Sequence, residues 1–165
     1  SLTSAKEFVD TLNAQMADGI RILEVKLLPE HAGNAMASVA AAKYSIAFRE
    51  GYFPSFLSSQ TIQEFYEQKE IIITKKTKKS EIIFDMKPFI YECTYDTQNT
   101  CINLIVDASS AGNIKPTLVL KALYAFYQQT LDEFGLLITR EETYANVGTD
   151  GSVLLEPLGF MGSDY

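Results

Sequence analysis

Hydrophobic and polar positions alternate along the chain with two periods, which predict helices and strands in mixed order. Apolar residues recur three or four positions apart in some stretches and every second position in others. The predicted helices cover residues 4–18, 34–42, 61–66 and 116–134. The predicted strands cover residues 20–27, 44–48, 71–74, 81–84, 89–95, 102–106 and 136–138.

Residue types at the ends of these segments support the boundaries. Ser4 and Glu7 have the spacing of a capping box, and Gly19 supplies a left-handed stop. Pro116 suits the first turn of a helix, where its missing N–H costs nothing. We therefore expect an α+β fold with a mainly antiparallel sheet of five to seven strands. The first helix and the Pro116 helix should pack on one face, in a ferredoxin-like arrangement.

Length and composition limit the classes of protein. The chain has 165 residues, a net charge of −7 and 47% hydrophobic residues, which is typical of a globular domain. We expect one α+β domain over residues 1–145 and a C-terminal extension over 146–165. No uncharged apolar run approaches the roughly 18 residues of a membrane-spanning helix, so no membrane partner is expected. Two cysteines and one histidine, far apart in the sequence, do not have the spacing of a structural zinc site, and they favour a reducing, cytoplasmic setting.

Four lysines stand out in this acidic chain, at the tip between the strands 71–74 and 81–84. They are Lys75, Lys76, Lys78 and Lys79. An exposed basic tip could bind the phosphates of RNA. Alternatively, the charges keep the hairpin soluble and discourage edge-to-edge pairing of strands. No aromatic residue interleaves with the lysines, so base stacking is not indicated, and the second interpretation is favoured.

A second charged pair follows the hairpin, where Pro88 interrupts the strand pattern. Proline cannot donate to a strand ladder, so a bulge or a change of strand is expected there. Asp85 and Lys87 should point to the same, solvent-facing side of an extended segment, while Met86 turns inward. The pair could present charge to a partner or only satisfy the bulge, and the structural interpretation is favoured.

The sequence predicts no catalytic residue, no metal ligand set and no cofactor. Gly-rich phosphate loops and the Gly-x-Ser-x-Gly elbow do not occur. Adjacent carboxylates such as Glu141 and Glu142 are typical of solvated faces. The chain is therefore not expected to be a catalyst on its own.

Several short motifs nevertheless resemble one family. Residues 85–90, Asp-Met-Lys-Pro-Phe-Ile, resemble the Asp-Ile-Arg-Pro-Tyr-Ile signature of the bacterial radical-SAM-linked proteins, a family of unknown function. Residues 12–14, Leu-Asn-Ala, followed by Gly19 and a strand, are similar to another passage of that family. The stretches 116–123 and 139–144 resemble its long helix and its closing segment. Family members are encoded beside, or fused to, radical S-adenosylmethionine proteins, which implies an accessory or substrate-presenting role.

The chain departs from this family in two ways. Lys87 stands where an arginine is usual, which removes the bidentate fork that recognises carboxylate or phosphate. Family members also begin with a longer segment that has no match here, so the chain resembles their C-terminal portion. If such a segment precedes it, the sheet formed by 23–27 and 44–48 lacks part of its neighbour. We then expect the exposed surface to be covered by a second copy of the chain, in a homodimer, or by the loop of Tyr52, Phe53 and Phe56.

Overall fold

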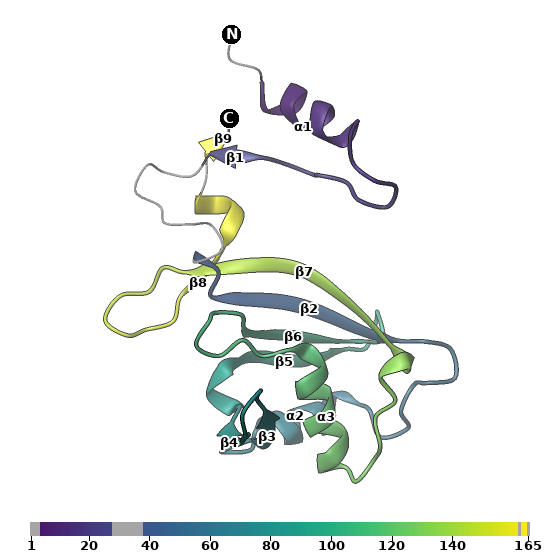
Figure 1. The fold of residues 1–165 in the computed structure, drawn as a ribbon. Coiled ribbons are helices and arrows are strands. Elements are labelled where there is room, and N and C mark those ends of the chain that lie inside the picture. Colours follow the sequence, from purple (N-terminus) through teal and green to yellow (C-terminus); the bar gives the residue numbers. More distant parts are fainter. Residues whose placement is uncertain (1–3, 28–37, 162, 165) are drawn as a thin grey trace.

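The main body of the protein is a five-stranded antiparallel sheet in the order β5-β6-β2-β7-β8 (Figure 1). The computed structural model describes residues 4–27, 38–161 and 163–164. The strands of this sheet are β2 (Ala41–Phe48), β5 (Ile90–Asp96), β6 (Cys101–Asp107), β7 (Leu136–Asn146) and β8 (Leu155–Pro157). The predicted antiparallel α+β fold is confirmed.

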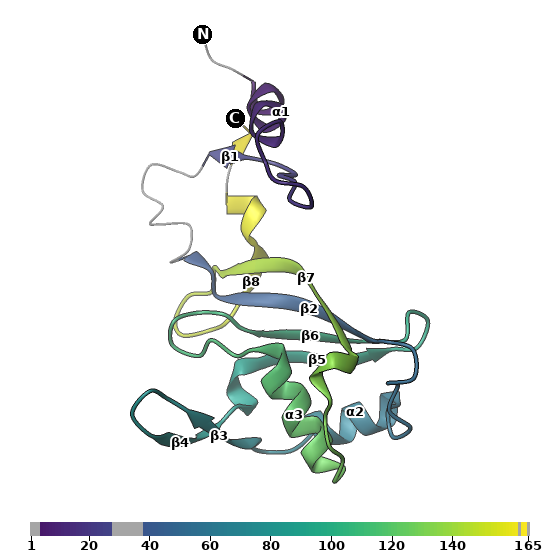
Figure 2. The ribbon, with the colours of Figure 1, turned by 45° about the vertical axis from the view of Figure 1, so that its right-hand side comes forward.

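Helices α2 (Ser59–Tyr66) and α3 (Pro116–Phe126) cover one face of the sheet (Figures 1 and 2). The order β2-α2-β5-β6-α3-β7, with β6 and β2 in the centre of the sheet, is the ferredoxin-like split βαβ topology. A two-stranded hairpin, β3 (Ile72–Lys76) and β4 (Glu81–Asp85), is inserted between α2 and β5. A 3₁₀ turn at Lys87–Phe89 joins the hairpin to β5, which confirms a change of strand at Pro88.

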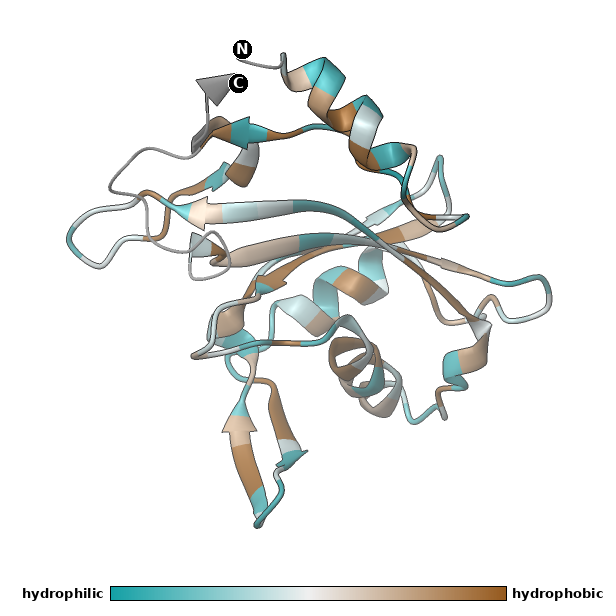
Figure 3. Cartoon of the chain, turned by 45° about the horizontal axis from the view of Figure 1, so that its top comes forward, coloured by the Kyte–Doolittle hydropathy of each residue, from teal (hydrophilic) through white to brown (hydrophobic). Residues whose placement is uncertain are grey.

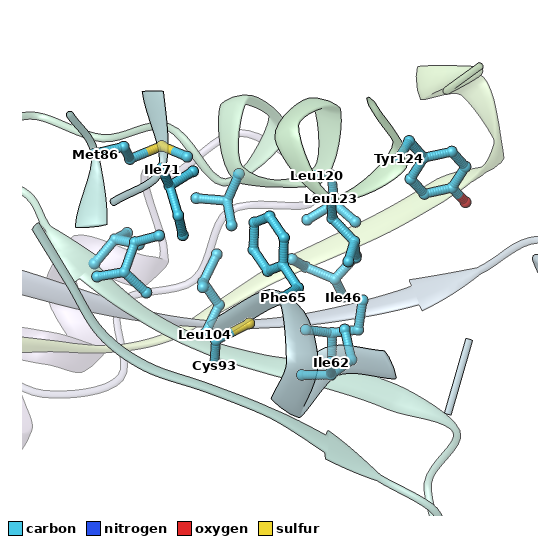
Figure 4. Packing of buried hydrophobic residues seen from close by; sticks show 14 of the residues in the cluster. Ile46, Ile62, Phe65, Ile71, Met86, Cys93, Leu104, Leu120, Leu123 and Tyr124 are labelled. Atoms are coloured by element: carbon cyan, nitrogen blue, oxygen red, sulfur yellow. The ribbon is translucent and has the colours of Figure 1, made fainter. Parts of the chain in front are cut away.

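The hydrophobic core lies between the two helices and the sheet (Figure 4). Phe65 of α2, Leu120 of α3 and Leu104 of β6 are at most 1% exposed. Burying a side chain of this size stabilises the fold by about 1.5–3 kcal/mol. The helices are thereby fixed on the sheet, and the hairpin that follows α2 is held beside α3.

The first helix, α1 (Ala5–Asn13), is not part of this core, contrary to the sequence-based expectation. The predicted capping box of Ser4 and Glu7 is present, but every residue of α1 keeps some exposed surface in the described chain. The helix ends at Asn13 rather than continuing to Gly19, which has the expected positive φ of 89°. The place predicted for this helix is taken by α2, whose Ile62 and Phe65 are buried.

The strand predicted over residues 20–27 is largely wrong. Only β1 (Lys26–Leu27) forms a ladder, with β9 (Ser163–Asp164), apart from the main sheet. A ladder needs a neighbouring strand, and no strand of the described chain pairs with residues 20–25. Leu23 is 84% exposed. Contrary to the expectation, it does not share a sheet with the strand 44–48. A homodimer stays a prediction.

Several other helices and strands begin or end at residues that differ from the predicted ones. The helix predicted over 34–42 lies partly outside the described residues, and Ala41 and Ala42 instead begin β2, where β6 and β7 pair with them on both sides. Ser58, rather than Thr61, caps α2. The α3 helix stops at Phe126, short of Phe134. Residues 133–135 form a 3₁₀ turn, and β7 extends to Asn146 as an inner strand.

Candidate functional site

The lysine-rich hairpin forms as predicted, and a close turn defines its tip. The β-branched residues that precede the tip favour strand structure, and Ile73 packs against the hydrophobic core. At the tip, the N–H of Thr77 donates to the carbonyl of Ser80 at 2.8 Å, and the Thr77 hydroxyl donates to the same oxygen. Lys78 and Lys79 are exposed in this turn. Figure 3 shows the hairpin projecting from the body as an arm with apolar segments.

Two of the predicted lysines line a hollow between β3 and the start of α3. Lys75 and Lys76 lie on one side of this hollow, and Lys115 and Lys121 lie on the other. Its volume is about 730 Å³, and Asn113, Thr117 and Thr74 also line it. Four of the chain's 14 Lys and Arg residues therefore gather around one hollow in an acidic protein. Such a concentration of charge favours an anionic ligand.

Carboxylates neutralise this charge only weakly. Glu133 pairs with Lys121 at 3.0 Å, and Glu81 lies 4.0 Å from Lys76. All four side chains are more than half exposed, so water and salt screen these pairs. An anion that enters the hollow can therefore compete for both lysines.

An apolar hollow of about 420 Å³ continues the first one along α3. The two share Thr74, Leu118 and Lys121, so they form one groove, which we call the β3–α3 groove. Its cationic end carries Lys75, Lys76, Lys115 and Lys121. Its apolar end is lined by Phe65, Ile71, Ile73, Ala122, Ala125 and Phe126. The groove therefore matches a ligand with a negative part and an apolar part.

A buried carboxylate fixes the loop that carries Asn113 and Lys115 into the groove. Asp107 is 7% exposed and accepts hydrogen bonds from the Tyr91 hydroxyl at 2.9 Å and the Ser109 hydroxyl at 2.7 Å. The backbone N–H groups of Ser109 and Asn113 donate to it as well. Burial and the hydrogen bond to Asp107 raise the pKa of Tyr91 to about 12. Asp107 thus positions the start of α3.

The loop before α3 requires glycine at position 112, because the backbone there packs directly against Asp107. A Cβ atom on Gly112 would lie 2.6 Å from the Asp107 carboxylate and 2.6 Å from the Phe89 ring. Real Cβ contacts are not that short, so any side chain here would displace the loop. The tight packing holds one wall of the groove in place.

The other predicted pair, Asp85 and Lys87, is engaged within the chain itself. Asp85 accepts from the backbone N–H groups of Ile71 at 2.8 Å and Lys87 at 3.0 Å. The ammonium group of Lys87 donates to the Tyr66 carbonyl and lies 3.5 Å from the centre of the Tyr66 ring. Met86 is fully buried, as predicted, but the expectation that Asp85 and Lys87 face solvent is wrong, because both are half-buried. Ligand binding by this pair stays a prediction.

The remaining reactive groups are buried or dispersed. Burial raises the pKa of the Cys93 thiol to about 12, so it stays protonated at neutral pH. Among residues 4–27, 38–161 and 163–164, no group of three or more His, Cys, Asp or Glu side chains could hold a metal ion. Within the same residues, no helix is long and apolar enough to cross a membrane.

The sequence indicated only half of the cationic end. Lys115 and Lys121 lie about 40 residues after the hairpin lysines, and neither belongs to a charge run. A helix that begins at Pro116 was predictable, but its position beside β3 was not. Asp107 gave no signal in the sequence beyond its place at the end of a strand.

Comparisons with known proteins place the chain in a family. Residues 1–116 match the family described as "Uncharacterized protein conserved in bacteria" (DUF2344). The match covers more than half of the chain, which therefore belongs to this family. Neither the curated proteins nor the solved structures contain a match.

Proposed function

We propose that the chain is a non-catalytic accessory module that binds an anionic partner in the β3–α3 groove. The observation that carries the proposal is the convergence of Lys75, Lys76, Lys115 and Lys121 on one hollow next to an apolar one. The resemblance to radical-SAM-linked proteins supports a radical S-adenosylmethionine enzyme as the partner. In this role the module holds the enzyme, or a substrate that it presents to the enzyme.

The chemistry of the described residues supports binding rather than catalysis. The Cys93 thiol is protonated and buried, so it is a poor nucleophile. Asp107 is occupied by four hydrogen bonds that hold the loop before α3. Both cysteines are free and buried, which is consistent with the proposed cytoplasmic setting.

RNA is a second candidate ligand, because the hairpin lysines lie on an exposed arm beside two further lysines. The face of the main sheet opposite α2 and α3 does not have the residues expected of an RNA-binding sheet. Four-stranded RNA-binding sheets stack bases on aromatic side chains. Here a row of small polar residues crosses the centre of that face, because the register aligns Thr94, Asn103, Ser45 and Thr139. RNA binding, if present, would use the groove and the hairpin tip.

The proposal is tested by co-purification with the radical S-adenosylmethionine protein encoded beside, or fused to, a member of this family. The test variant changes four groove lysines, Lys75, Lys76, Lys115 and Lys121, to Gln. A matched control changes four lysines outside the groove, Lys6, Lys26, Lys43 and Lys69, to Gln. We expect the control to keep the complex and the groove variant to lose it. Equal retention by both variants would contradict the proposal.

A further inference from the structure

One edge of strand β3 carries backbone groups without a partner in the described chain. The N–H of Met86 donates to the carbonyl of Ile71, and the N–H of Thr77 donates to the carbonyl of Ser80, both at 2.8 Å. These pairs share the register of the β3–β4 ladder. In an antiparallel ladder, alternate residues direct both backbone groups toward the partner strand. Ile73 and Lys75 therefore bond to β4, while Ile72, Thr74 and Lys76 direct their N–H and C=O groups away from it.

The β3–α3 groove runs along this unpaired edge. The hairpin residues that line it run consecutively from Ile71 to Lys76, all on the β3 side. Consecutive residues of a strand point to opposite faces, so a hollow that touches all of them lies along the edge. The edge is also long enough to pair, because five strand residues span about 17 Å.

We propose, resting on the function proposed above, that the partner supplies an extended peptide segment that adds to β3 as a third strand. Its backbone pairs with Ile72, Thr74 and Lys76, which is the β-augmentation mode of peptide recognition. Its acidic side chains meet the cationic end of the groove. Its apolar side chains enter the apolar end beside Ala122 and Phe126.

Charge complementarity selects this occupant. Lysines on an edge strand repel other basic strands and discourage nonspecific pairing. The same lysines favour an acidic strand, so the charge that protects the edge also sets its specificity. A nucleic acid could neutralise the lysines, but it would leave the unpaired N–H groups and the apolar end of the groove unused. The hairpin also exposes Ile72 and Ile83, which are 51% and 76% exposed and could be covered by a partner.

The test uses the whole chain and two fluorescein-labelled peptides, Glu-Asp-Glu-Asp-Val-Thr-Val-Ile and its reverse, to allow both strand directions. Binding is measured by fluorescence anisotropy. Thr74→Pro removes one free-edge N–H, and Thr74→Val keeps that N–H while it replaces the hydroxyl with a methyl group. We expect Thr74→Pro to weaken binding at least about tenfold and Thr74→Val less than about twofold. The four-lysine groove variant should weaken binding at least about tenfold and reduce its dependence on salt.

Amide hydrogen exchange of the unaltered chain gives a second measurement, which does not depend on how Thr74→Pro folds. The bound peptide should slow exchange at Ile72, Thr74 and Lys76 at least about tenfold. Ile73 and Lys75 already donate to β4 and should change much less. A scrambled peptide of the same composition, methylated on alternate backbone nitrogens, should fail to protect the three amides.

The outcomes separate this inference from the proposed function. If a polyuridine RNA or the partner enzyme binds through the four lysines while neither peptide protects the β3 amides, strand addition is overturned and the anion-binding role stands. If no peptide, RNA or partner enzyme shows lysine-dependent binding, both proposals fail. Protection of Ile72, Thr74 and Lys76 by either peptide, with binding that depends on the four lysines, supports strand addition.

Discussion

Both ends of one hairpin carry charged side chains, but the charges have different partners. At the base, the carboxylate of Asp85 and the ammonium of Lys87 bind backbone groups of the chain itself. Toward the tip, Lys75 and Lys76 face a hollow that also receives Lys115 and Lys121. The base therefore uses charge to hold the fold, and the groove keeps charge accessible to a ligand. Partner groups, rather than charge itself, distinguish a structural residue from a binding residue.

The comparison predicts that changes at the base lower stability, while changes in the groove lower binding. The effects on stability and on binding should be separable, because no hydrogen bond or ion pair of the described residues joins Asp85 or Lys87 to the groove lysines.

Met86→Ala should have the largest effect. This side chain lies between Asp85 and Lys87 and is fully buried in the core. Its removal should lower the free energy of unfolding by about 2–5 kcal/mol, because it leaves a cavity. Urea denaturation measures the change, and Met86→Leu serves as a control that conserves volume. A loss of less than about 0.5 kcal/mol would mean that the base of the hairpin is not anchored in the core.

Asp85→Ala should lower the free energy of unfolding by about 1–3 kcal/mol, because the half-buried N–H groups of Ile71 and Lys87 lose their acceptor. Asp85→Asn keeps an oxygen acceptor and should cost less. Peptide binding measured on the folded fraction should stay unchanged in both variants. A selective loss of binding without a loss of stability would move Asp85 into the binding site.

Tyr91, which bonds to Asp107 in the wall of the groove, should have a smaller, pH-dependent effect on stability. The phenol of Tyr91 has a pKa of about 12 in the folded chain, against 10.0 as its ordinary value, so the folded state holds the proton more tightly. Its contribution to stability should be full below pH 10 and should disappear as the pH rises to about 12. Tyr91→Phe should cost about 0.5–1.5 kcal/mol at neutral pH and flatten this alkaline decline. Denaturant titrations between pH 8 and 12 measure the free energy of unfolding. If its alkaline decline is unchanged in Tyr91→Phe, groups other than Tyr91 cause the decline.

The sequence predicted the parts of the fold that depend on neighbouring residues. The Ser4–Glu7 capping box and the strands before and after the lysine tip each rest on short-range patterns, and the structure confirms them. The isolation of α1 and the poor pairing of residues 20–25 depend on which surfaces meet in space. Periodicity shows that a segment has an apolar face, but it does not show what covers that face.

The candidate site divides in the same way. Lys75 and Lys76 were visible as part of a charge run, whereas Lys115 and Lys121 join them only because α3 packs beside the hairpin. The roles of Asp85 and Lys87 could not be read from the sequence either. Their hydrogen-bond partners are backbone groups, such as the N–H of Ile71 and the carbonyl of Tyr66, which most residue types could supply at those positions.

The most direct test of the account measures stability and binding together in the four-lysine groove variant, with Lys75, Lys76, Lys115 and Lys121 changed to Gln. Lys76, Lys115 and Lys121 are exposed and Lys75 is half-buried, so the free energy of unfolding should change by less than about 1 kcal/mol. In the same preparation, binding of the acidic peptide should weaken at least about tenfold and lose most of its salt dependence. Unchanged peptide affinity in a folded variant would contradict the central claim that the groove is the binding site.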